Sequence, residues 1–217
     1  MLPFTRDQFL EVFVAYNNAI WPAQWIAYAL GAVAVLFLVW RNVWSDRIIV
    51  AVVALMWVWT GVVYHGLFFA PINKAAYLFG LLFVAEGAWL AYAGLVRNEL
   101  GFGLRGGVAG WVGGGLIAYA AIIYPLVGMA MGHAYPEMPV FGVTPCPVTL
   151  FTFGLLLLTT RHYSRWPLVI PFLWSLVGGS AALALAMPQD WLLLISGLVA
   201  VPLIVRGDRR PTGLAPA

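Results

Sequence analysis

The chain has 217 residues, of which 63% are hydrophobic and 9% are charged. A soluble domain carries about 25% charged residues, so this composition excludes an ordinary soluble protein and indicates that lipid surrounds most outward-facing side chains. The formal net charge of +3 is small and falls near the ends of apolar runs, so nucleic-acid binding is not expected.

Long apolar runs predict an all-α bundle of about seven transmembrane helices. The runs are continuous instead of alternating, which favours helices over a membrane β-barrel. The predicted helices cover residues 20–40, 48–70, 75–95, 108–131, 141 or 145 to 160, 167–187 and 191–205. A crossing needs about 20 apolar residues, so the last helix is long enough only if Pro188 and Gln189 extend it, or if the bilayer thins locally.

Basic residues predict the orientation. All lysines and arginines except Arg6 and Lys74 follow the first, third, fifth or seventh predicted helix. The positive-inside rule then places the N-terminus outside and the C-terminus in the cytoplasm. The expected organisation is an N-terminal amphipathic segment over residues 1–19, a transmembrane domain over 20–205 and a cytoplasmic tail over 206–217.

The segment before the first predicted crossing has a helix-start signature. Thr5 and Gln8 have the spacing of a capping box, and Phe9, Phe13 and Tyr16 follow at helical spacing. Two interpretations stay open: the helix lies on the outer membrane surface, or it packs over the outer loops as a lid.

Small residues recur every four positions in the fourth predicted helix, at Gly106, Gly110, Gly114 and Ala118. This pattern lets two helices approach closely. Packing against another helix of the same chain is the simpler interpretation, and a second copy or another membrane subunit is the alternative.

The sequence Thr144-Pro145-Cys146-Pro147 predicts a helix start. Thr144 can cap the helix, and proline suits the first helical position. Cys146 is the only cysteine and falls in the first turn, where free amide groups favour a thiolate that could bind a soft metal or act as a nucleophile. A small, inert core residue is the simpler interpretation.

Other polar residues are expected near the outer surface. His65 follows Tyr64 at the outer end of the second predicted helix, Asn73 lies in the next loop and His133 follows the fourth helix. With Cys146, the two histidines would make a three-ligand site for a transition metal if they converge. The alternative for the histidines is hydrogen bonding to backbone and tyrosine at the interface, and the alternative for Asn73 is helix capping or anchoring at the headgroups.

Glu86 is the only acid inside a predicted crossing. A charge at the bilayer centre costs about 2.5 to 3.5 kcal/mol, so Glu86 is expected to face the bundle interior. It is a candidate for a ligand or proton pathway, and a protonated packing residue is the alternative.

Three stretches carry a family resemblance: Pro3 to Gln24, Tyr64 to Asn73, and Phe141 to Pro147 with the Thr149, Phe151, Thr152 and Phe153 that follow. Together they resemble an uncharacterised family of small bacterial membrane proteins, a domain of unknown function. The resemblance implies a multi-pass protein of the bacterial inner membrane, with no established activity and no catalytic residue to carry over.

Three hypotheses follow. The first is a module that binds or transports a small ligand or metal ion from the periplasmic side, through His65, Glu86, Cys146, Tyr64 and Asn73. The second is a membrane enzyme that uses an activated Cys146. The third is a non-catalytic subunit or homo-oligomer that docks through the glycine face.

Overall fold

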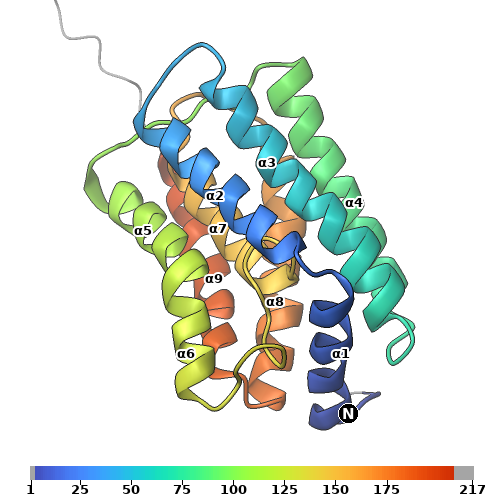
Figure 1. Cartoon of the computed structure of the whole chain (residues 1–217). Coiled ribbons are helices and arrows are strands. Elements are labelled where there is room, and N and C mark those ends of the chain that lie inside the picture. Colours follow the sequence, from blue (N-terminus) through green and yellow to red (C-terminus); the bar gives the residue numbers. More distant parts are fainter. Residues whose placement is uncertain (1–2, 208–217) are drawn as a thin grey trace, which may run out of the picture.

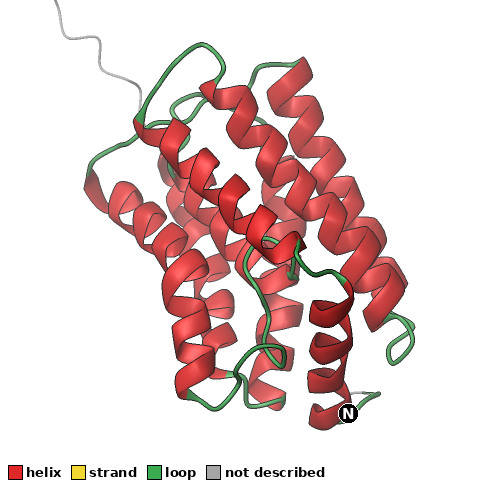
Figure 2. Ribbon diagram, in the orientation of Figure 1, coloured by secondary structure: helices red, strands yellow, loops and turns green. Residues whose placement is uncertain are grey.

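The computed structural model describes residues 3–207, and every regular element in that part of the chain is helical (Figures 1 and 2). Five continuous helical stretches are long and apolar enough to cross a membrane. They are α3 with η1 (Ser45–Trp59, Thr60–Phe69), α4 with η2 (Ala76–Ala91, Tyr92–Val96), α5 with η3 and α6 (Gly107–Ala118, Tyr119–Ile123, Tyr124–Ala130), η4 with α8 (Trp166–Leu168, Val169–Ala184), and η5 with α9 (Pro188–Asp190, Trp191–Gly207).

Each of the seven predicted runs contains a helix, so the all-α fold class is confirmed. Pro188 does extend the last run, through the short 3₁₀ turn η5. The number of complete crossings stays a prediction, because α2 (Ala23–Val39) joins α1 (Arg6–Ala19) at an 85° bend and α7 (Pro145–Leu157) has 13 residues. Most of the predicted tail, from residue 208, lies outside the described residues.

Helix α7 forms the centre of the bundle. Every residue from Pro147 to Leu157 is buried, against α3, α5, α8 and α9. At 1.5 Å per residue, α7 is about 20 Å long, which is short of the roughly 30 Å apolar thickness of a bilayer. Because protein surrounds it, this helix does not have to match that thickness.

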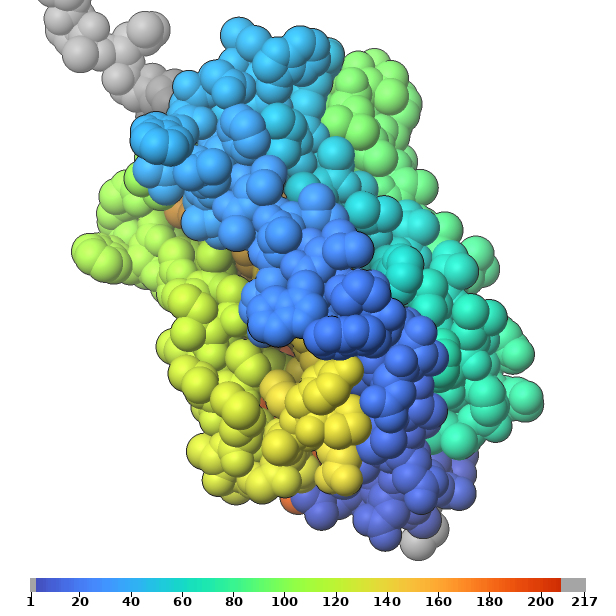
Figure 3. Space-filling view, viewed as in Figure 1, coloured from blue at the N-terminus to red at the C-terminus, as the bar shows by residue number. Residues whose placement is uncertain are grey.

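An irregular segment, residues 131–144, leads into α7 and lies between α1 and α6 on the surface (Figure 3). The Asn17 side chain donates hydrogen bonds to the carbonyls of Pro136 and Met138, at 2.7 and 2.8 Å. Further along, Gly142 has a φ of +77° and lies so close to Ala27 that a Cβ atom would sit 2.8 Å from it. The segment therefore runs inward from the end of α1 along α2, which places the start of α7 inside the bundle.

The capping box at α1 is confirmed, because the Gln8 amide donates to Thr5 Oγ1 and the Thr5 amide donates to Gln8 Oε1. Val12, Phe13 and Tyr16 are buried, and α1 packs against η1. The apolar side of α1 thus faces protein, as the lid interpretation expects.

The basic loops meet at the end of the bundle opposite α1 (Figure 1). Arg161 donates to the carbonyl of Asn98 at 3.0 Å, and Arg105 donates to the carbonyl of Thr159 at 2.9 Å. The charge asymmetry predicted from the sequence is therefore present between the two ends, and which end faces the cytoplasm stays a prediction.

The glycine face predicted in the fourth helix does not make the expected contact within the chain, and docking of this face to a second copy or another subunit stays a prediction. Gly106, Gly114 and Ala118 are exposed, and a Cβ atom on Gly106 or Gly114 would meet nothing within 4 Å. The close approach lies one residue away, where a Cβ atom on Gly113 would sit 2.9 Å from the carbonyl oxygen of Gly154 in α7. The expected internal packing exists, but Gly113 makes it.

Candidate functional site

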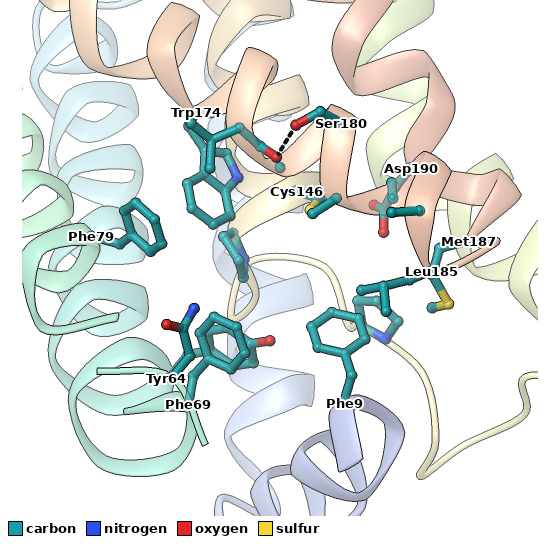
Figure 4. A pocket seen from close by; sticks show the side chains of 18 of the residues that line it. Phe9, Tyr64, Phe69, Phe79, Cys146, Trp174, Ser180, Leu185, Met187 and Asp190 are labelled. Atoms are coloured by element: carbon teal, nitrogen blue, oxygen red, sulfur yellow. Dashed lines mark hydrogen bonds between the residues drawn. The ribbon is translucent and has the colours of Figure 1, made fainter. Parts of the chain in front are cut away.

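A cavity of about 440 Å³ opens at the end of the bundle that carries α1 (Figure 4). Its walls come from α1, η1, α4, α8, the start of α7 and the turn η5. The inward course of residues 131–144 creates this space, because α7 begins inside the bundle and leaves its first turn facing the cavity. Segments distant in sequence thus enclose a single site.

Aromatic rings form much of the wall: Phe9, Phe13, Tyr64, Phe69, Phe79 and Trp174. Phe9 and Phe13 lie one helical turn apart on α1 and pack edge to face at 4.9 Å between ring centroids. Tyr64 and Phe69 both belong to η1, a ten-residue π-helical stretch of the kind often found at functional sites. The aromatic wall is therefore contributed by four helices, which ring contacts join in two pairs, α1 with η1 and α4 with α8.

The polar part of the cavity centres on Cys146 and Asp190 (Figure 4). Asp190 is 3% exposed, and its carboxylate accepts a hydrogen bond from the Tyr124 hydroxyl and lies near the Cys146 thiol. The Cys146 side chain is only partly buried, since it lines the cavity. The Trp174 indole N–H lies near the thiol but has no hydrogen-bond partner.

The predicted cap at the start of α7 is only partly confirmed. Pro145 occupies the first helical turn as expected, but the Thr144 hydroxyl donates to the Val140 carbonyl at 2.8 Å and makes no capping bond. The predicted activation of Cys146 also lacks support, because an apolar cavity and the Asp190 carboxylate both oppose a second negative charge.

Three of the predicted ligand-binding residues, Tyr64, Asn73 and Cys146, line the cavity. His65 lies outside it, fully buried between the rings of Phe83 and Trp174 at centroid distances of 4.7 and 5.1 Å. Neither of its ring nitrogens has a hydrogen-bond partner.

Two other candidates also lie away from the cavity. Glu86 faces the interior, as expected, with 1% exposure and no hydrogen-bond partner for Oε1. His133 lies in the irregular segment, where its Nε2 accepts a hydrogen bond from Arg6 at 2.8 Å.

The three proposed metal ligands are therefore in three different settings. His65 is enclosed by rings, His133 is bonded to Arg6, and Cys146 lines the cavity. Within residues 3–207, no group of three His, Cys, Asp or Glu side chains is arranged to hold a metal ion.

A family model, described as a family of unknown function (DUF6064), matches residues 6–213. The chain belongs to this family. The resemblance to an uncharacterised family is thereby confirmed over nearly the whole length of the chain. No curated protein and no solved structure matches it.

For this DUF6064 member, sequence reasoning missed Asp190 and Trp174. Asp190 directly precedes the last predicted helix, and in the structure it is a second buried acid. Its place after Pro188, at the start of an apolar helix, was the available signal. Trp174 is one of eleven tryptophans, and nothing in its local sequence separated it from those expected at the headgroups.

Proposed function

We propose that this protein is an integral membrane protein that binds a small, largely apolar molecule in the cavity beside Cys146 and Asp190. The observation that carries the proposal is the cavity itself, whose volume of about 440 Å³ is typical of sites for small molecules. A mostly aromatic wall with a few polar groups at one end is also typical of such sites.

The structure favours an organic ligand over a metal ion, because the predicted metal ligands do not converge. It favours binding over nucleophilic catalysis, because the surroundings of Cys146 oppose a thiolate. Binding is a first step of transport as well, so the cavity is compatible with transport from the end that carries α1, which the orientation prediction places in the periplasm of a bacterial inner membrane.

Cys146 supplies the test, since it is the only cysteine of the chain and lines the cavity. The protein in lipid nanodiscs is treated with the neutral thiol reagent methyl methanethiosulfonate, with and without isobutylbenzene as an apolar probe. We expect Cys146 to be labelled, and isobutylbenzene to slow the labelling in a saturable manner.

A pair of tryptophan variants controls the test. Ala181→Trp adds an indole to the cavity wall, whereas Leu198→Trp adds one to an exposed position on α9. We expect Ala181→Trp to slow labelling by about tenfold or more, because a filled cavity excludes the reagent, and Leu198→Trp to change it less than about twofold. The proposal would be refuted if Cys146 is labelled only after unfolding. It would also be refuted if neither isobutylbenzene nor Ala181→Trp changes the rate of labelling.

A further inference from the structure

Among the described residues that line the cavity, Asp190 is the one acid, and there is no lysine, arginine or histidine. The Tyr124 hydroxyl that donates to its carboxylate and the Cys146 thiol beside it are both neutral groups. A buried carboxylate without a cationic partner is costly. A positively charged ligand would provide that partner, because no basic side chain of the cavity wall does.

The rings around the cavity suit the same kind of ligand. A cation is attracted to the face of an aromatic ring within about 6 Å of its centroid, most strongly to tryptophan and tyrosine. Trp174 and Tyr64 both line the cavity, together with phenylalanines from α1 and η1. Rings from several directions, combined with a carboxylate, form the arrangement that recognises ammonium groups.

The two basic residues at this end are both held away from the cavity. Arg6 is bonded to His133, and the Lys74 ammonium lies 5.9 Å from the centroid of the Tyr77 ring. Neither side chain lines the cavity. Exposed acids at the same end, Asp7, Glu11 and Glu137, add to a negative local potential that attracts cations.

We propose that the cavity selects a hydrophobic organic cation, an amine or quaternary ammonium compound whose charge lies beside Asp190 and whose apolar part contacts the aromatic wall. This inference rests on the proposed binding function and adds the chemical class of the ligand.

Charged thiol reagents of similar size test the inference at Cys146. A methanethiosulfonate transfers its thioalkyl group to the thiol, which forms a mixed disulfide and releases methanesulfinate. We compare the reagent that carries a trimethylammonioethyl group with the one that carries a sulfonatoethyl group. A surface cysteine, Ala15→Cys in a Cys146→Ser background, corrects for the intrinsic reactivities, because Ala15 is exposed on α1 at the same end.

After this correction, we expect the cationic reagent to label Cys146 at least about tenfold faster than the anionic one. Asp190→Asn keeps the size of the side chain and removes its charge. The ratio of the cationic to the anionic labelling rate at Cys146 should then fall to within about twofold of the ratio at the surface cysteine. The matched control Glu137→Gln removes an exposed acid and should leave most of the preference in place, because solvent screens that charge.

A second measurement uses reversible ligands. Benzyltrimethylammonium and neopentylbenzene have nearly the same shape, and only the first is charged. We expect benzyltrimethylammonium to protect Cys146 from the neutral reagent methyl methanethiosulfonate, and to lose this effect in Asp190→Asn.

The outcomes separate the two proposals. If methyl methanethiosulfonate does not label Cys146 even when the pH is raised to increase the thiolate fraction of the folded protein, the cavity is inaccessible and both proposals fail. If labelling is slowed by isobutylbenzene and Ala181→Trp but the charged reagents show no corrected preference, or the preference survives Asp190→Asn, binding stands and the cation class is wrong.

Discussion

Arg6 donates a hydrogen bond from Nη2 to Nε2 of His133 at 2.8 Å, which ties the first turn of α1 to the irregular segment before α7. The bond requires a neutral imidazole, because a protonated ring has no acceptor. Burial and the Arg6 guanidinium lower the pKa of His133, against a smaller opposing effect of Glu137.

The first prediction concerns pH. A lowered pKa in the folded state means that the unfolded chain takes up the His133 proton first, so this contribution to stability is complete above about pH 6.5 and is lost as the pH falls below it. We expect the thermal midpoint in detergent to fall between pH 7.5 and pH 5, by the equivalent of about 1 kcal/mol. His133→Gln keeps an acceptor that does not titrate, so an equally large fall in that variant would contradict the assignment.

The second prediction concerns the contact between α5 and α7. Gly113→Ala places a methyl group 2.9 Å from the Gly154 carbonyl oxygen and should destabilise the protein by about 1 to 3 kcal/mol, because the two backbones must separate. Its neighbour Gly114 meets nothing within 4 Å, so Gly114→Ala should stabilise the helix by about 0.5 to 1 kcal/mol. Thermal unfolding of the two variants measures the difference. Effects of the same sign would contradict the placement of Gly113, and not Gly114, against α7.

The third prediction concerns the carboxylate at the cavity. Tyr124→Phe removes a buried donor to Asp190 and should lower the stability by about 1.5 to 3 kcal/mol, as expected for a hydrogen bond to a charged group. Tyr119 donates to the backbone carbonyl of the adjacent Gln189 at 2.8 Å, so Tyr119→Phe is a matched control with an expected loss of about 0.5 to 1.5 kcal/mol. Chemical denaturation in mixed micelles ranks the two, and equal losses would argue that Asp190 is uncharged.

The fourth prediction concerns Glu86, which is buried with one carboxyl oxygen unpartnered. Glu86→Met replaces it with an apolar side chain of similar length and should raise the stability by about 1 to 3 kcal/mol, because the unsatisfied oxygen disappears. Thermal unfolding in detergent measures the change. A marked loss of stability would mean that Glu86 has a structural partner that compensates for its burial.

Much of the fold could be predicted from apolar runs and local signals. The helix starting at Pro145, the capping box of Thr5 and Gln8, and the extension of the last run through Pro188 all follow from short-range chemistry. The basic loops were also predicted to share one end, and their hydrogen bonds show that they do.

The candidate site was less predictable, because it depends on where helices begin relative to one another. Tyr64, Asn73 and Cys146 were singled out for their chemistry and do line one cavity. The same reasoning grouped His65 and His133 with them, although one faces a ring cluster and the other faces Arg6. Sequence gives the depth of a residue along a helix but not the direction in which its side chain points. For the same reason it did not show that the close contact within the chain lies at Gly113 and not at Gly114.

The shortness of α7 has a consequence for how the chain is assembled. Thirteen residues do not cross a bilayer alone, and α1 side chains pair with the backbone carbonyls of Pro136, Met138 and Val143 in the segment before α7. Insertion of this region must therefore wait until its neighbours on both sides, including the later α8 and α9, have been synthesised. Assembly of the cavity is then a late event, and a chain released before α8 would lack both part of the packing around its central helix and one wall of the cavity.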